Sequence, residues 1–539
     1  MKGGCILESI RIKNVRSLKD TGRVSLPRIT LLVGENSSGK STFLRTFPLI
    51  KQSICKRTDG PLLWAGDVDD YVDFGSFSET VTNDNSDTIE FEFAFPFEYD
   101  DRYSAYYPTN LYEVPGHSTK SNYISYSIVI SKRKSREFIS RLDVHLNNTA
   151  IIFKTESPSS VASIEVDGIN IVADTQNPKE PDRYYYNYSA HRNVFGFTFP
   201  SINDIRSNLR NQLIAPTDDE QPEYVSSLSR MEEWATIQFI GSCLCHGMTI
   251  EEIESLVISS AQTSKRKPRS SYRLRLDIVR KVLTASEAEQ RIYFANLKLL
   301  FVYSCLPQID MYLETYFRQV HYIAPLRATA ERYYRLRNLA IDEVDYQGKN
   351  LAIFLHGLSE QKRTNFQKWT QEQFGFKVFT EIDGGHVSVK IALCENNKAI
   401  NLSDTGFGYS QILPIITQLW DLSTRKHSKQ KESVPLVIAI EQPELHLHPA
   451  IQAKLADAFI ACIHLAEKNG YQLQLLLETH SQTIVNQFGR SIIAEQLKTD
   501  DISVLLFDKG FGEIQTTVRV SNYSSDGFLE NWPIGFFAP

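Results

Sequence analysis

The stretch RITLLVGENSSGKSTFLRTF (28–47) joins an apolar run, a glycine-bounded loop and the first turns of a helix. The run 29–33 consists mostly of aliphatic residues, which favours a strand buried in a parallel sheet. Residues 34–41 fit the pattern G-x-x-x-x-G-K-[ST] of a phosphate-binding loop. A chance match in a glycine-containing turn is the alternative, but the strand before the loop and the helix after it favour phosphate binding.

The spacing within this loop suits the binding of a nucleotide. Small residues let the backbone wrap around a phosphate so that successive N–H groups point inward, and the following helix adds its N-terminal dipole. Lys40 supplies a positive charge for the outer phosphates, and the Ser41 hydroxyl can bind Mg²⁺. The loop residues predicted to hold the nucleotide are Gly34, Glu35, Asn36, Ser37, Ser38, Gly39, Lys40 and Ser41.

A second apolar strand, in PLVIAIEQPELHLHP (435–449), ends in a cluster of polar residues. The strand runs directly into Glu441, Gln442 and Glu444. Carboxylates at the end of a buried strand need a partner cation or a reaction to serve. An apolar strand that ends in an acid is also the kind of element that holds Mg²⁺ beside a phosphate-binding loop, so we predict that Glu441 serves the metal.

A third apolar strand, in LQLLLETHS (473–481), carries Glu478 and His480 at its carboxyl end. In a parallel α/β sheet, the residues at the carboxyl ends of the strands line the ligand crevice. We therefore expect Lys40, Glu441 and His480 to converge, although they are far apart in the sequence.

A glycine-rich turn opens another helix, in NLSDTGFGYSQILPIITQLW (401–420). Gly406 and Gly408 frame the turn, and Ser410 with Gln411 begins the helix. Such a turn offers a second anion site, although alone it is weak support for one.

Length and composition indicate a globular protein of two to four domains. The 539 residues carry 58 basic and 64 acidic side chains, a net charge of -6, which argues against nucleic-acid binding over the whole surface but permits local basic patches. Seven scattered cysteines favour reduced thiols, and the sequence Cys243-Leu244-Cys245-His246 lacks a second cluster for zinc. The N-terminus lacks a signal peptide, and the apolar run 297–306 is too short to span a bilayer, so we predict a cytoplasmic protein without membrane contact.

The sequence divides into four predicted segments. Residues 1–100 begin an α/β domain, 101–199 continue it with alternating strand patterns, 200–320 form a mostly helical insertion, and 321–539 complete the domain.

Two basic runs, 132–136 and 265–281, are candidate nucleic-acid contacts. Solvated faces or flexible loops are the more common explanation of such runs.

The order of the motifs GENSSGKS, LSDTGFGYSQ, IAIEQPELHLHP and LETHS resembles the ABC/SMC-type ATPases of the OLD-like group. Within that group the chain is most similar to the ATPase subunit of Septu-type bacterial anti-phage systems, including those linked to retrons. The resemblance covers the first hundred residues and roughly 320–539. It implies an ABC/SMC-type P-loop ATPase head that binds ATP and Mg²⁺.

The resemblance also implies roles for individual residues. Two heads would sandwich two nucleotides, with the glycine turn of one subunit meeting the γ-phosphate held by the other. His480 matches the switch histidine, Thr42 extends the phosphate loop, and Ser41 with Glu441 would hold Mg²⁺. The signature candidates are Ser403, Gly406, Gly408, Ser410 and Gln411.

Gln442 stands where many relatives place the glutamate that orients the attacking water. A neutral amide positions water but is a poor proton acceptor. Either Glu444 takes that role or hydrolysis is slow, and we favour slow hydrolysis.

The partners that the resemblance implies are a second copy of the chain and a separate HNH nuclease subunit. Retron-linked members add a reverse transcriptase with its RNA/DNA product. Several OLD-type relatives carry a nuclease domain after the ATPase, and none is expected here. The alternative function is an SMC-like DNA repair ATPase that acts on DNA ends, although its long heptad arms are not apparent.

Overall fold

A computed structural model describes residues 7–56, 58–67, 70–82, 87–97, 122–157, 160–171, 227–263, 270–336, 341–393, 398–425, 435–509 and 515–533. The chain forms two compact units. Residues 57–62 and 87–314 make up the strand-and-helix unit, and residues 2–56, 63–86 and 315–539 make up the loop-bearing unit. The boundary at residue 314 falls within the long helix α7 (Glu287–Arg318).

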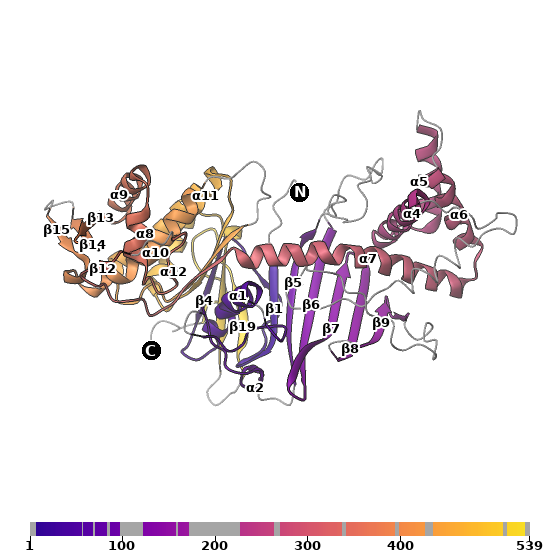
Figure 1. The fold of residues 1–539 in the computed structure, drawn as a ribbon, viewed down its shortest axis with the longest axis horizontal. Coiled ribbons are helices and arrows are strands. Elements are labelled where there is room, and N and C mark those ends of the chain that lie inside the picture. The colour runs from indigo at the N-terminus through magenta and orange to yellow at the C-terminus, as the bar shows by residue number, and fades with distance from the viewer. Residues whose placement is uncertain are drawn as a thin grey trace. The chain divides into compact units, whose positions relative to one another are not determined.

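A six-stranded sheet forms the centre of the loop-bearing unit (Figure 1). Its first five strands are parallel, and only the last pairing is antiparallel. Every residue of the second, third and fourth strands is buried, as the apolar runs predicted. The strand order is β11 (Val320–Ile323), β16 (Leu436–Glu441), β17 (Leu473–Glu478), β4 (Ile29–Gly34), β18 (Ile502–Asp508) and β19 (Thr517–Ser521).

Helices cover this sheet and bury its side chains. Helix α1 packs against β4, β11, β16 and β17. Ile29, Leu31 and Val33 of β4 lie in a core cluster with apolar residues of α10, α11 and α12. The predicted α/β fold class is confirmed by this architecture. The helices of this unit are α1 (Lys40–Cys55), α2 (Phe77–Thr80), α8 (Leu351–Gly357), α9 (Glu360–Phe374), α10 (Phe407–Thr424), α11 (Pro449–Lys468) and α12 (Gln482–Ile493).

Shorter strands complete the loop-bearing unit. Near the N-terminus, β1 pairs antiparallel with both β2 and β3. A small antiparallel sheet precedes α10, and its longest pairing joins β13 to β14. These strands are β1 (Ser9–Val15), β2 (Leu18–Asp20), β3 (Val24–Ser25), β12 (Tyr334–Arg335), β13 (Phe376–Asp383), β14 (His386–Leu393) and β15 (Ala399–Asn401).

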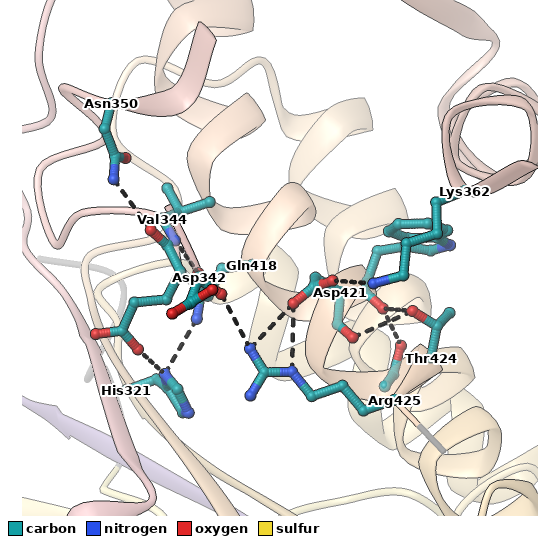
Figure 2. Close-up of polar contacts among 12 residues, drawn as sticks. His321, Asp342, Val344, Asn350, Lys362, Gln418, Asp421, Thr424 and Arg425 are labelled. Carbon is teal, nitrogen blue, oxygen red and sulfur yellow. Dashed lines mark hydrogen bonds and ion pairs between the residues drawn. The ribbon is translucent and has the colours of Figure 1, made fainter. Parts of the chain in front are cut away.

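A polar network joins α10 to β11, to α9 and to the segment around Val344 of the same chain (Figure 2). Gln418 of α10 accepts a hydrogen bond from the Val344 N–H and lies 3.1 Å from the Nδ1 atom of His321 at the β11 strand. The same histidine nitrogen lies 2.9 Å from a carboxylate oxygen of Glu343. Near the end of the helix, Asp421 pairs with Lys362 of α9 at 3.2 Å. The helix that follows the glycine turn is therefore anchored along its second half.

The strand-and-helix unit contains an antiparallel meander and four helices. Strands β5 to β10 pair in sequence order, so the alternating patterns expected for 101–199 are strands where the structure describes these residues. The structure places these strands in one unit with the helices, whereas the predicted segments assigned 101–199 to the ATPase head. The elements are β5 (Thr88–Phe97), β6 (Asn122–Arg133), β7 (Arg136–Leu146), β8 (Thr149–Ser157), β9 (Ser160–Val166), β10 (Ile169–Asn170), α4 (Ser227–Cys245), α5 (Ile250–Thr263), α6 (Ser270–Thr284) and α7.

The two basic runs lie in different settings. Residues 132–136 span the end of β6, the turn and the start of β7, and Arg133, Lys134 and Arg136 are exposed there. Much of 265–281 belongs to α6, while 264–269 lie outside the described residues. The Arg275 guanidinium packs over the ring of Phe239 at 4.4 Å, so this residue serves the fold. Nucleic-acid contact through either run stays a prediction.

Helix α7 is longer than the apolar run 297–306 that the sequence argument considered, because the flanking residues continue the helix through Pro307. By length and composition it is the one helix in the described ranges that could cross a membrane. Within the structure 61% of its most apolar window is buried, which is also typical of a core helix. The absence of a membrane partner therefore stays a prediction.

We predict that Asp310 of α7 makes the stability of the strand-and-helix unit depend on pH. Burial raises the pKa of Asp310 to about 7, and its carboxylate accepts a hydrogen bond from Tyr126 at 3.3 Å. Because the folded state holds this proton more tightly than the unfolded chain, the stability that Asp310 contributes is fully present below about pH 4 and is lost as the pH rises through 7.

The change Asp310→Asn should remove this dependence. It should stabilise the protein at pH 8, by up to about 4 kcal/mol, and have little effect at pH 4. Urea unfolding of both proteins at the two pH values measures the difference. Equal stabilities at pH 8 would contradict the prediction.

Candidate nucleotide and metal site

The loop-bearing unit contains a cavity of about 470 Å³ at the carboxyl ends of its central strands. The phosphate-binding loop, the turn after β1 and the ends of β16 and β17 contribute to its walls. The lining residues are Arg16, Ser17, Asn36, Ser37, Ser38, Gly39, Lys40, Ser41, Thr42, Gln442, Glu478 and His480. The structure thus brings Lys40 and His480 to one cavity, as the convergence argument expected.

The loop backbone requires glycine at two positions. Gly39 has a φ of 91°, and a Cβ atom there would lie 2.7 Å from the Ser17 Oγ atom. A Cβ atom at Gly34 would lie 2.3 Å from the carbonyl oxygen of Phe507 in β18. Helix α1 begins at Lys40 without a side-chain cap, so its first N–H groups are available to an anion.

Lys40 is held inside the loop. Its Nζ atom donates hydrogen bonds to the carbonyl oxygens of Gly34 at 3.0 Å and Glu35 at 2.5 Å. Burial lowers the pKa of Lys40, although nearby carboxylates oppose the shift. A phosphate group in the cavity would supply the missing counter-charge for this ammonium.

Glu441 lies at the end of β16 but does not line the cavity. Its two carboxylate oxygens accept hydrogen bonds from Nε and Nη2 of Arg45, both at 2.7 Å. Tyr322 donates a further bond to the Oε1 atom at 2.8 Å. The carboxylate that was predicted to serve Mg²⁺ is therefore neutralised and hydrogen-bonded by its own chain.

Glu478 lies at the matching position of β17, because Glu441 and Glu478 are paired in the strand register. Its Oε1 atom accepts a hydrogen bond from the Ser41 hydroxyl at 2.8 Å. Its Oε2 atom is buried and has no hydrogen-bond partner among the described residues. Burial, followed by the charge of Glu441, raises the pKa of Glu478 to about 7.

These oxygens fit a hard divalent cation. Mg²⁺ prefers hydroxyl, carboxylate and phosphate oxygens. The Ser41 hydroxyl and the unpartnered Glu478 oxygen offer such a set at the cavity wall. Mg²⁺ therefore fits the residues present, with Glu478 rather than Glu441 beside Ser41.

Gln442 adopts an unusual backbone conformation. Its φ is 43°, and its N–H donates to the Glu478 carbonyl at 2.9 Å. Arg327 donates through Nη2 to the carbonyl oxygens of Glu441 and Gln442 at 2.9 and 3.3 Å. Burial lowers the pKa of Arg327 to about 10. These bonds fix the segment that presents Gln442 to the cavity.

Glu444 connects this segment to the end of β17. Its carboxylate accepts hydrogen bonds from the Thr479 hydroxyl at 2.9 Å and from the His480 N–H at 2.6 Å. Burial raises the pKa of Glu444, and the residue does not line the cavity. Its position suits a structural role in holding His480 more than contact with an attacking water.

His480 lines the same cavity as the phosphate loop. Burial, followed by the positive charge of Lys40, lowers the pKa of His480. The imidazole is therefore neutral at pH 7 and can donate one hydrogen bond and accept another.

The signature candidates lie outside the cavity within a single chain. A Cβ atom at Gly408 would lie 3.2 Å from the carbonyl oxygen of His446, and Gln411 donates to the Arg327 carbonyl at 3.3 Å. The start of α10 therefore packs beside the 442–448 segment. Ser410 donates to the Phe407 carbonyl, and Ser403 donates to Asn401.

Several residues of this region were not predicted from the sequence: Arg16, Ser17, Arg45, Tyr322 and Arg327. A signal existed for Arg45, because it stands four residues after Ser41 and so shares its face of helix α1. The positions of Arg16 and Tyr322 depend on long-range packing.

Cys243 and Cys245, from the cysteine sequence at 243–245, are buried free thiols in α4. Burial raises the pKa of both Cys243 and Cys245 to about 12, so the thiols stay protonated. Across the described residues, no group of three potential metal ligands from His, Cys, Asp and Glu is found.

The family model for the AAA ATPase domain matches residues 6–266 and 309–485. These ranges contain the phosphate loop and the polar ends of β16 and β17. The chain belongs to this family. Membership supports the reading of the cavity as a nucleotide site.

A curated relative is endonuclease GajA of Bacillus cereus (strain HuB5-5). It is 30% identical over 101 residues, which are 18% of this chain and 15% of GajA. The match thus spans a small part of GajA.

Among solved structures, the fold resembles two SMC head domains. The Smc head domain of Pyrococcus furiosus bound to the C-terminal domain of ScpA has a TM-score of 0.32 at 10% identity, with 96% of each chain covered. The SMC head domain of Thermotoga maritima has a TM-score of 0.33 at 8% identity, with 95% of this chain and 98% of that chain covered. Neither similarity is high enough to support a functional inference.

We predict that Arg45→Met destabilises the loop-bearing unit by about 3 kcal/mol, because it leaves the Glu441 carboxylate buried without its counter-charge. The double change Arg45→Met with Glu441→Met should recover most of the loss, since it removes both charges together. Urea unfolding measures both effects. A double variant that is no more stable than the single variant would contradict the ion-pair explanation.

Proposed function

We propose that this chain is the ATP-binding ATPase subunit of a bacterial anti-phage complex, dimerising around ATP and controlling a separate nuclease of the HNH type. The observation that carries the nucleotide part is the single cavity shared by Lys40, Gln442, Glu478 and His480. Family membership supports the ATPase part, and the partial likeness to endonuclease GajA supports a link to a nuclease. Dimerisation around ATP and the HNH type of the nuclease are implied by the sequence resemblance. The Septu and retron connections rest on the sequence resemblance alone.

Each wall of the cavity has a task in this proposal. The backbone N–H groups of the loop and the start of α1 bind the phosphates, while Lys40 neutralises the outer ones. Arg16 lines the same cavity and adds a second positive charge. When bound, Mg²⁺ supplies charge neutralisation between the phosphate oxygens. His480 is neutral and donates or accepts a hydrogen bond near the terminal phosphate.

Slow hydrolysis follows from the chemistry of Gln442. Gln442 lines the cavity, and an amide can position water but accepts a proton poorly. Glu444 is already hydrogen-bonded to Thr479 and the His480 N–H. Binding of ATP therefore lasts long enough to hold a closed state.

Closure requires a second copy in this proposal. The signature candidates lie away from the chain's own cavity, so they are available to cover the nucleotide of a partner. The complex would hold the HNH nuclease inactive while ATP is bound, and a phage trigger or nucleotide loss would release it. Such control requires ATP to bind the two arrangements with different affinities.

We expect Lys40→Ala to weaken the binding of a fluorescent ATP analogue by about tenfold to a hundredfold, the value of a charge-assisted hydrogen bond. Phage plaque assays should show loss of defence when this variant is expressed with its neighbouring genes, which we expect to include an HNH nuclease. The matched control is Lys349→Ala, an exposed lysine that does not line the cavity. Intact defence with Lys40→Ala would count against the proposal.

We expect Gln442→Glu to raise ATP turnover by at least about tenfold, because a positioned general base contributes about 10²–10⁴-fold. Gln442→Ala is the control and should not raise turnover. Phosphate release by the purified protein measures both. Glu444 would be identified as the general base if turnover were unchanged in Gln442→Glu and lost in Glu444→Gln. Strong stimulation by DNA ends would favour the SMC-like repair alternative.

A further inference from the structure

We propose that Glu478, together with Ser41, binds the divalent cation of this site, and that Glu441 serves instead to anchor Arg45 and Tyr322. This assignment rests on the proposed binding of ATP with Mg²⁺. It states which of the two carboxylates at the strand ends, Glu441 or Glu478, binds the metal ion.

The strand order places Glu478 closer to the phosphate loop. Strand β17 lies directly beside β4, and Glu478 is aligned with Leu32, two residues before the loop begins. Strand β16 lies one position farther away, with Glu441 aligned with Glu478. Neighbouring strands are about 4.8 Å apart, so the backbone of Glu441 is displaced by about one strand spacing from that of Glu478.

The hydrogen bonds distinguish the two carboxylates further. Arg45 and Tyr322 donate three bonds to the oxygens of Glu441, which is only 2% exposed. Metal binding by Glu441 would have to break the Arg45 pair and leave its guanidinium without that partner. Glu478 accepts one bond, from Ser41, and its other oxygen has no hydrogen-bond partner among the described residues.

Charge balance favours the same assignment. Glu441 forms an ion pair with Arg45, whereas the described residues place no ion pair on Glu478. A buried carboxylate without a paired cation is unfavourable, and a divalent cation in the cavity would supply the missing charge. Because Ser41 already points to Glu478, the hydroxyl and the carboxylate are preorganised on one side of the cavity.

The two residues should therefore respond in opposite ways to the same change. Glu478→Gln removes a buried carboxyl group that has no ion pair among the described residues, so the protein without ligand should melt at the same or a higher temperature. Glu441→Gln disrupts a satisfied ion pair, so the melting temperature should fall. The affinity for Mg²⁺ should respond in the opposite order. Glu478→Gln should lose more Mg²⁺ affinity than Glu441→Gln.

The experiment measures the binding of a fluorescent ATP analogue while Mg²⁺ is titrated, for the wild type, Glu478→Gln, Glu441→Gln and Lys40→Ala. We expect the Mg²⁺ concentration that gives half of the maximal change in analogue binding to rise at least about tenfold in Glu478→Gln. The same concentration should change less than about threefold in Glu441→Gln. Should Glu441→Gln not fold, the paired change Arg45→Met with Glu441→Met replaces it. Electron paramagnetic resonance of Mn²⁺ with the bound analogue gives a second readout.

The outcomes separate this inference from the proposed function. A wild type that binds no nucleotide overturns both. Normal nucleotide binding with Mg²⁺ dependence lost in Glu441→Gln but kept in Glu478→Gln overturns the assignment alone. Equal loss in both variants also overturns it, because the assignment requires the two carboxylates to differ.

Discussion

The parallel pairing of β17 between β16 and β4 is the constraint on which the site depends. This pairing sets the ends of three strands from distant parts of the sequence at one edge of the sheet. It aligns Glu441 with Glu478 and places Glu478 beside the start of the phosphate loop. A shift of one residue in either register would turn these side chains to the opposite face and dismantle the cavity.

Two glutamates at equivalent positions have acquired different environments. Glu441 accepts hydrogen bonds from Arg45, while Glu478 keeps a buried oxygen for which the described part of the chain provides no hydrogen-bond partner. Natural sites often retain such unfavourable groups because a ligand completes them. The contrast explains how one sheet edge can be both well anchored and ready for a cation.

The sequence predicted much of this arrangement. The loop at 34–41 follows from its spacing, and the apolar runs before Glu441 and Glu478 were recognisable as buried strands. The order of those strands in the sheet was not predictable, because it depends on helix packing across hundreds of residues. For that reason the hydrogen bonds of Arg45 to Glu441 could not be predicted, and the role of Glu441 at the metal stays a prediction. The boundary between the two units was not predicted for a similar reason. An alternating pattern of apolar and polar residues identifies the strands within 122–155, but it does not show which hydrophobic core those strands join.

The central claim is that distant segments converge on one triphosphate that a second copy closes over. A crystal or cryo-electron microscopy structure with a non-hydrolysable ATP analogue and Mg²⁺ tests it most directly. The account predicts phosphates within the 34–41 loop, next to Gln442 and Glu478, with residues 403–411 of a second copy facing them. An analogue bound elsewhere, or an empty loop at saturating analogue, would contradict it.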